Sequence, residues 1–307
     1  MKVVVLSGGV GGARFVQGLV DAVDARDVTV VGNVGDDVEV LGLHVSPDLD
    51  SVLYALAGLN DEERGWGRAG ESWQALETVR VLGGEGWFAL GDRDLGLHLV
   101  RTAALRAGEP LSAVTARLAA AYGVEARLLP ATDGRLRTWI DTAAGSFPFQ
   151  EWFVARGHRD DVDGVRFEGA DAAAPAAGVL EAIDAADALL IAPSNPYVSI
   201  APILAVAAVR DALERRSVPC VAVSPLIGGR AVKGPADRML TRLDGGTAPR
   251  HVTSCYKGLI DAIVVDEADA DDLAGLDGVQ AIVTRTLMVD AGARRRLAEA
   301  ALGGVPA

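Results

Sequence analysis

Short, continuous apolar runs recur along this chain of 307 residues, and each run ends in a turn of small or polar residues. The runs cover residues 3–6, 188–192, 218–223 and 263–265, and a similar β-branched segment that includes one threonine covers 28–31. Runs of this length, rich in β-branched residues, are typical of parallel strands that are buried on both faces. Segments with helical spacing lie between them. The sequence therefore predicts an α/β fold with a Rossmann-like, doubly wound and mostly parallel sheet, which binds ligands at the carboxyl ends of its strands.

The middle of the chain has a different pattern. Residues 137–142 and 147–155 carry β-branched and aromatic side chains on either side of a small-residue turn, which predicts an antiparallel hairpin. Helices are predicted for residues 73–82, 93–107 and 111–122, and again for 203–215 and 291–301. We expect a single domain over residues 1–307, with a small antiparallel and helical insertion at about 60–170.

The charge balance restricts the class of ligand. The net charge of −13 argues against a surface for nucleic acid or for an anionic membrane, and no apolar stretch reaches the length of a membrane span. The two cysteines, Cys220 and Cys255, are too few for a disulfide framework, so a reduced, cytoplasmic location is expected. An anionic ligand is still allowed, because local backbone N–H groups bind phosphate.

Glycines follow the first predicted strand. Gly8, Gly9, Gly11 and Gly12 stand between this strand and a helix, where backbone N–H groups and the helix dipole favour a phosphate group. Arg14 occupies the position where a dinucleotide fingerprint requires its last glycine, and no Gly-Lys-Ser/Thr of a P-loop follows. The alternative is a tight turn with close packing of the helix on the sheet. We interpret the loop as a phosphate site.

Acidic residues follow the second strand and begin the next helix. Asp36 and Asp37 lie in a loop, and Asp48 and Asp50 follow Ser46, the predicted N-cap of a helix. Turn formation explains the first pair, and interaction with the helix dipole explains the second. Both acidic segments also reach the carboxyl edge of the sheet, where Mg²⁺ that bridges phosphates would bind. Both interpretations stay open for each residue.

Two further motifs lie at the starts of predicted helices or the ends of strands. Arg93 begins a helix in which Arg93 or Asp94 shares a face with His98 and Arg101, so either a phosphate contact or a solvated charged face is expected. Ser194 and Asn195 follow the strand at 188–192, and a similar turn at 224–229 follows the next one. Ordinary turn chemistry explains each turn alone. Their repetition favours nucleotide binding.

Taken in order, these segments resemble the 2-phospho-L-lactate transferase family of coenzyme F420 biosynthesis. The loop at 7–14 and the Gly-Trp-Gly at 65–67 resemble the actinobacterial members, which are associated with phosphoenolpyruvate. The matching segments are 7–14 (SGGVGGAR), 33–37 (NVGDD), 46–50 (SPDLD), 90–94 (LGDRD), 149–152 (FQEW), 192–196 (APSNP) and 224–229 (SPLIGG).

The resemblance implies a Rossmann-like homodimer. It implies transfer of a phosphoenolpyruvyl or 2-phospho-L-lactyl group from a diphospho-guanosine donor to the deazaflavin Fo, with Mg²⁺ bound and GMP released. Asp50 and Arg93 match the deazaflavin-contacting positions, and Asp50 is the candidate catalytic residue. The acids of both acidic segments match the metal region, with Asp37 and Asp48 as the candidate ligands, and the resemblance does not decide which aspartate of each pair binds the metal. The side that binds the guanosine phosphates matches Gly8, Gly9, Gly11, Gly12, Ser194 and Asn195.

Two other functions compete with this one. A non-catalytic regulator that binds a nucleotide sugar would share the same core, but the acidic loops and the aromatic segment at 147–153 favour the transferase. A nicotinamide-dependent dehydrogenase is disfavoured by Arg14 in the glycine loop. The histidines show no ligand spacing, which disfavours zinc and a Ser-His-Asp triad.

Overall fold

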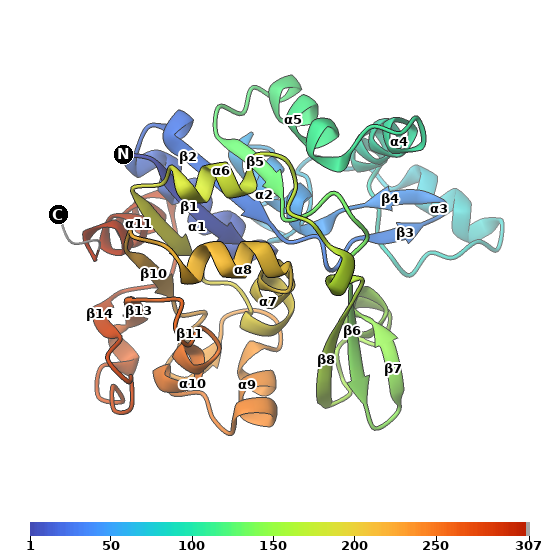
Figure 1. The fold of residues 1–307 in the computed structure, drawn as a ribbon. Helices are drawn as coiled ribbons and strands as arrows, with labels where there is room; N and C mark the ends of the chain where they lie inside the picture. The colour runs from blue at the N-terminus through green and yellow to red at the C-terminus, as the bar shows by residue number, and fades with distance from the viewer. Residues whose placement is uncertain (305–307) are drawn as a thin grey trace.

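The computed structural model describes residues 1–304 and contains a central parallel sheet. Seven strands lie in the order β14-β13-β10-β9-β1-β2-β5, and every neighbouring pair is parallel. This confirms the predicted α/β fold (Figure 1). The strands of the sheet are β1 (Val3–Ser7), β2 (Val28–Gly32), β5 (Arg127–Pro130), β9 (Ala188–Ile191), β10 (Cys220–Val223), β13 (Ala262–Asp266) and β14 (Gln280–Thr284).

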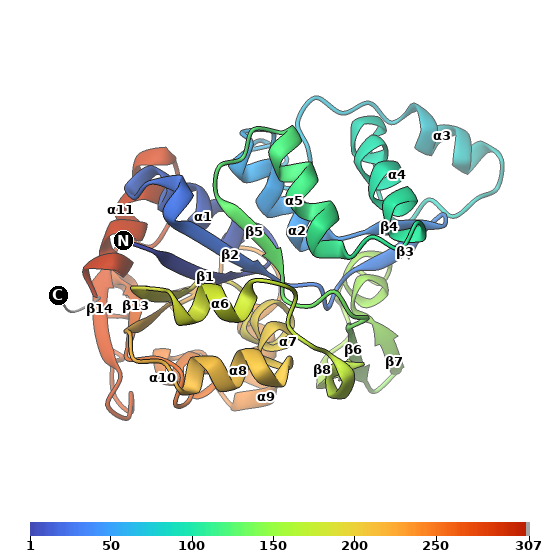
Figure 2. The same ribbon diagram turned by 45° about the horizontal axis from the view of Figure 1, so that its top comes forward.

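Helices cover both faces of the sheet (Figures 1 and 2). On one face, α2 (Pro47–Leu56) and α11 (Ala291–Gly303) both pack against α1 (Gly9–Ala22). The helices α6 (Val179–Asp184) and α8 (Ala207–Glu214) pack together on the other face. The residues of β1 and β9 are therefore buried on both sides, which explains their continuous apolar sequence.

The direction of winding reverses at β1. From β1 the chain adds β2 and β5 on one side, then crosses the sheet and adds β9, β10, β13 and β14 on the other. The loops after β1 and β9 therefore leave the sheet in opposite directions, and the crevice between them is the usual ligand site of a doubly wound fold.

Two excursions leave the central sheet. The first lies between β2 and β5, and it holds β3 (Val38–Val40), β4 (Leu43–Val45), α3 (Gln74–Val81), α4 (Asp92–Arg106) and α5 (Leu111–Ala121). The second follows β5 and forms an antiparallel sheet of β6 (Arg137–Thr142), β7 (Gly145–Pro148) and β8 (Val162–Glu168). The region predicted as one insertion at about 60–170 is thus divided by β5, which pairs with β2.

Two of the predicted elements are shorter than expected. The hairpin strand predicted at 147–155 ends at Pro148, and residues Glu151–Ala155 form a helical turn instead. The helix predicted at 203–215 is broken into α7 (Ala201–Leu204) and α8. Val206, between the two helices, is extended and fully buried, so packing of this side chain turns the chain where no glycine or proline marks a break.

The remaining elements complete the C-terminal half. They are a short hairpin of β11 (Leu226–Ile227) and β12 (Arg230–Ala231), followed by α9 (Ala236–Asp244) and α10 (Pro249–Ser254). Within residues 1–304, no single helix is long and apolar enough to cross a membrane. The segments Pro196–Leu204 and Ala207–Glu214 pass that test only as a pair, and they bend by 89° where they meet.

Candidate active site

The glycine loop and the loop after β9 meet at the switch point of the sheet. Ser194 Oγ donates a hydrogen bond to the carbonyl of Gly8 at 2.8 Å. A Cβ atom at Gly11 would lie 2.7 Å from the Pro193 carbonyl oxygen, and one at Gly12 would lie 2.6 Å from Ser194 Oγ. Gly11 and Gly12 are therefore required for the close approach of α1 to the 193–194 turn, whatever the loop binds.

Gly9 is placed differently. It is the first residue of α1 and has a φ of +66°, and the nearest atom to an added Cβ would be Ser199 Oγ at 3.6 Å. The N-cap residue of α1, Gly8, has no side chain to cap the helix, and the Asp48 carboxylate interacts with the N–H of Gly9. The N–H groups of α1 that follow Gly9 can therefore bind a phosphate. The predicted partner Asn195 is engaged elsewhere, because its Oδ1 accepts the N–H of Tyr197 at 2.9 Å.

Three aspartates gather beside this loop around Asn33, which is fully buried. The Asn33 side-chain amide donates to Asp36, to Asp48 Oδ2 at 2.9 Å and to the Val198 carbonyl at 3.1 Å. Burial raises the pKa of Asp36 well above its usual value, and the negative charges of Asp48 and Asp37 raise it further. Burial also raises the pKa of Asp48 to about 6, although the hydrogen bond from Asn33 lowers it.

Asp37 is buried on the same side of the loop. Its Oδ2 accepts a hydrogen bond from Ser46 Oγ at 3.0 Å and lies 2.9 Å from His44 Nε2. Its Oδ1 is buried and has no hydrogen-bond partner among residues 1–304. The prediction that Ser46 caps α2 is wrong in one respect, since its hydroxyl makes this contact with Asp37 and does not bond the helix N–H groups.

The chemistry of these carboxylates suits a magnesium ion. The negative charges of Asp37 and Asp48 both disfavour ionisation of Asp36, and one oxygen of Asp37 lacks a partner among the described residues. The described residues include no group of three or more side chains already arranged as metal ligands. Mg²⁺ typically takes one or two carboxylates and completes its shell with phosphate oxygens and water, so the donor set suits it.

Asp50 faces a second buried group, on α4. Arg101 donates from Nη1 to Asp50 Oδ2 at 2.9 Å and from Nη2 to the other carboxylate oxygen, and both side chains are almost completely buried. His98 Nδ1 lies 3.8 Å from Asp50 Oδ2, and its Nε2 lies 3.4 Å from Asp94. A substrate hydroxyl at Asp50 would therefore share a carboxylate oxygen with Arg101 or His98.

Arg93 does not join this buried group. Its guanidinium is exposed beside Gly70, where an added Cβ would lie 2.9 Å from Nη1. Of the residues expected to share a helix face, Asp94, His98 and Arg101 face the protein, and Arg93 faces solvent at the start of α4. The contact with deazaflavin that is predicted for Arg93 would therefore lie at the outer rim of the site.

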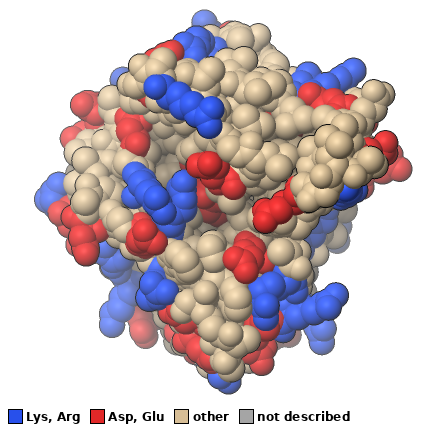
Figure 3. All heavy atoms as spheres, turned by 90° about the vertical axis from the view of Figure 1, so that its right-hand side faces the viewer, with Lys and Arg blue, Asp and Glu red and all other residues tan. Residues whose placement is uncertain are grey.

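Several site residues were not selected from the sequence. Asn33 holds the carboxylates of Asp36 and Asp48 together, and its position after a strand is only a weak signal of this. His98 and Arg101 had the correct helical spacing, but nothing in the sequence paired them with Asp50. Figure 3 shows the molecule from the right-hand side of Figure 1, and acidic side chains lie around the middle of this face.

The fold and the site together define a doubly wound α/β protein with a phosphate-type loop and an acidic cluster at its switch point. The model of the family described as 2-phospho-L-lactate transferase CofD matches residues 3–296, and the chain belongs to this family. It is therefore a transferase of the family that serves coenzyme F420 biosynthesis, and the resemblance of its motifs is confirmed.

Curated relatives cover nearly the whole chain. A phosphoenolpyruvate transferase of Streptomyces griseus is 43% identical, over 98% of this chain and 98% of its own length. A phosphoenolpyruvate transferase of Thermobifida fusca is 45% identical, over 90% of each chain. A crystal structure of a UPF0052 family member from Bacillus halodurans has the same fold, with a TM-score of 0.66, 19% identity and 98% coverage of both chains.

Proposed function

We propose that this protein moves a phosphoenolpyruvyl group from a diphospho-5'-guanosine donor to the ribityl hydroxyl of Fo. The products are dehydro coenzyme F420-0 and GMP, or coenzyme F420-0 when the donor carries 2-phospho-L-lactate. The names of the actinobacterial relatives support enolpyruvate. The observation that carries the proposal is the contact between the start of α1 and the aspartates around Asn33: a Cβ atom at Gly8 would lie 2.5 Å from Asp48 Oδ2. This reaction needs both a phosphate site and a metal site.

The donor side uses the start of α1. A diphosphate placed there would meet the N–H groups beyond Gly9 and the positive end of the helix dipole. Ser194, held to Gly8, closes the other side of the loop. These groups favour the negative charge that grows on departing GMP when its bond to the phosphorus breaks.

The metal side uses the acidic cluster. Asp37 and Asp48 would hold Mg²⁺, which supplies neutralising charge to the transferred phosphoryl group. Without a cation the carboxylates are buried together, and the pKa of Asp48 is raised for that reason. With a cation, the same burial strengthens its attraction to the carboxylates, since water that would screen the charges is excluded.

The acceptor side uses Asp50. The ribityl oxygen forms a new bond to the phosphorus, and its proton must leave. Asp50 orients the hydroxyl and accepts its proton, while Arg101 fixes the carboxylate in one orientation. Arg93 contacts the deazaflavin from the rim. We also propose a homodimer as the working assembly.

The deciding experiment is an activity assay with Fo, Mg²⁺ and each guanylated donor in turn, read by the mass of the product. Formation of dehydro coenzyme F420-0 with release of GMP is expected from the enolpyruvyl donor. Absence of product with both donors, in a protein that still binds a nucleotide sugar, would instead support the non-catalytic regulator.

A further inference from the structure

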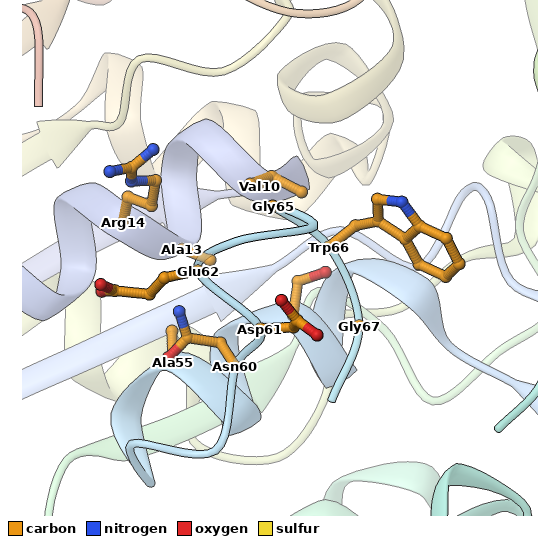
Figure 4. Close-up of a pocket in the computed structure, with 11 residues that line it drawn as sticks. Val10, Ala13, Arg14, Ala55, Asn60, Asp61, Glu62, Gly65, Trp66 and Gly67 are labelled. Carbon is orange, nitrogen blue, oxygen red and sulfur yellow. The ribbon is translucent and has the colours of Figure 1, made fainter. Parts of the chain in front are cut away.

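A loop of residues 60–73 crosses the outer side of α1 and α2 and covers a pocket there (Figure 4). The helices contribute Val10, Arg14 and Ser51 to the pocket wall, and the loop contributes Asp61 and Trp66. Val10 belongs to the first turn of α1, and Ser51 follows Asp50 in the chain. The pocket therefore lies beside both the phosphate loop and the helix that carries the candidate catalytic aspartate.

Trp66 lies at the edge of this pocket, and its indole extends away from the other residues that line it (Figure 4). Its side chain is 45% exposed. The Arg64 guanidinium carbon lies 4.6 Å from the Trp66 ring centroid and 5.1 Å from that of Trp73, and the two rings are 6.3 Å apart. Arg64 is itself fixed, because Nη2 donates to the Arg68 carbonyl at 2.8 Å. We call Arg64, Trp66 and Trp73 the aromatic wall; its ring positions are set before any ligand binds.

The aromatic wall is attached to the start of α4. Ser72 Oγ donates to Asp92 at 2.6 Å, and the N–H of Ala75 donates to the other oxygen of Asp92 at 3.0 Å. Glu71 accepts the backbone N–H groups of Arg93 and Asp94 at 2.8 and 2.9 Å. The wall and the helix that carries Arg93 and Arg101 are therefore held in one fixed arrangement.

We propose that Trp66 determines specificity for the acceptor, by stacking its exposed indole face on the flat ring of the deazaflavin. This inference rests on the proposed function. An exposed indole backed by a guanidinium suits a planar heteroaromatic ring, because stacking is favourable and a fixed side chain loses little conformational freedom on binding. With the ring at the wall, the ribityl chain would have to reach the start of α2, the helix that carries both Asp50 and the pocket-lining Ser51.

The test compares Trp66→Ala and Trp66→Phe in the full chain with Mg²⁺. Binding of Fo and of the guanylated donor is measured separately by calorimetry, and KM and kcat are measured for both. Trp66→Ala should raise the Kd and KM for Fo about tenfold, the range expected for loss of one stacked ring, with the donor KM unchanged. Trp66→Phe should retain most of the affinity. Because Trp66 is half-exposed, both variants should fold, and their melting temperatures check this.

A matched control is Trp139→Ala. Trp139 also carries an arginine over its ring, Arg166 at 5.7 Å, but it lies in β6 on the antiparallel sheet. This variant should leave the affinities for both substrates unchanged. The proposal is overturned if Trp66→Ala binds Fo with an affinity within twofold of the native value. It is also overturned if only the affinity for the guanylated donor falls, because the ring would then contact guanine. If the native protein binds no Fo at all, the proposed function itself fails.

Discussion

Replacing Asp50 by asparagine removes the charged partner of a buried guanidinium. Arg101 is 1% exposed, and both of its Nη atoms donate to Asp50. Removing one member of a buried ion pair typically costs about 3–5 kcal/mol, because the remaining charge is uncompensated in a medium of low polarity. If Asp50 were only an acid in the first turn of a helix, the loss of its dipole interaction would cost about 0.3–1 kcal/mol.

We therefore expect the free energy of unfolding of Asp50→Asn to fall by about 3–5 kcal/mol, measured by urea denaturation monitored with circular dichroism. The matched control is the double variant Asp50→Asn/Arg101→Met, which removes the buried charge as well. It should be more stable than Asp50→Asn alone, and the double-mutant cycle should show coupling of more than about 1 kcal/mol.

Turnover needs a separate measurement at a temperature where both variants are folded. If Asp50 orients the hydroxyl and accepts its proton, turnover of Asp50→Asn should fall roughly a hundredfold or more. A stability loss below about 1 kcal/mol, with additive effects in the cycle, would refute the argument from the buried pair. Near-native turnover would remove Asp50 from the catalytic site.

Three further predictions concern the donor and metal sides. Transfer should require Mg²⁺ or Mn²⁺ and stop in excess chelator, and full activity in chelator, measured by product mass, would contradict the metal site. Gly9→Ala has room for its Cβ and should cost only about 1–2 kcal/mol of backbone strain. It should nevertheless weaken binding of the donor, measured by calorimetry. Gly12→Val, whose side chain has no room, should mainly reduce the melting temperature. An unchanged donor affinity in folded Gly9→Ala would mean that the loop is only a packing turn. In the metal-free protein, burial raises the pKa of Asp48 to about 6, above the unfolded value of about 3.9, so the folded state binds this proton more tightly. Protonation of Asp48 therefore contributes its full stabilisation of the folded state below about pH 4, and this contribution is lost as the pH rises through 6. Asp48→Asn should accordingly gain up to about 3 kcal/mol relative to the native protein between pH 4 and 7, measured by urea denaturation, and a constant difference across this range would contradict the assignment.

The sequence by itself determined the class of fold, the order of most elements and the family. The runs that became β1, β9 and β10 are apolar at every position because helices cover both faces of the sheet. The Gly, Asp and Ser residues that follow them lie at the carboxyl edge as expected. Periodicity of apolar residues reports the surroundings of each segment, and those surroundings are the same in all doubly wound folds.

The tertiary structure alone decided which side chains meet. The edge strand β14 and the strand β5 were not predicted, because their sequences lack the continuous apolar signal of the central strands. Ser46 lies at the N-cap of α2 as expected, but its hydroxyl donates to Asp37 and does not cap the helix. Asp50 and Arg101 are 51 residues apart, and each has an adequate local explanation as a helix-end acid or a solvated base. Their pairing depends on the packing of α4 against α2, and the spacing within either helix carries no information about the other.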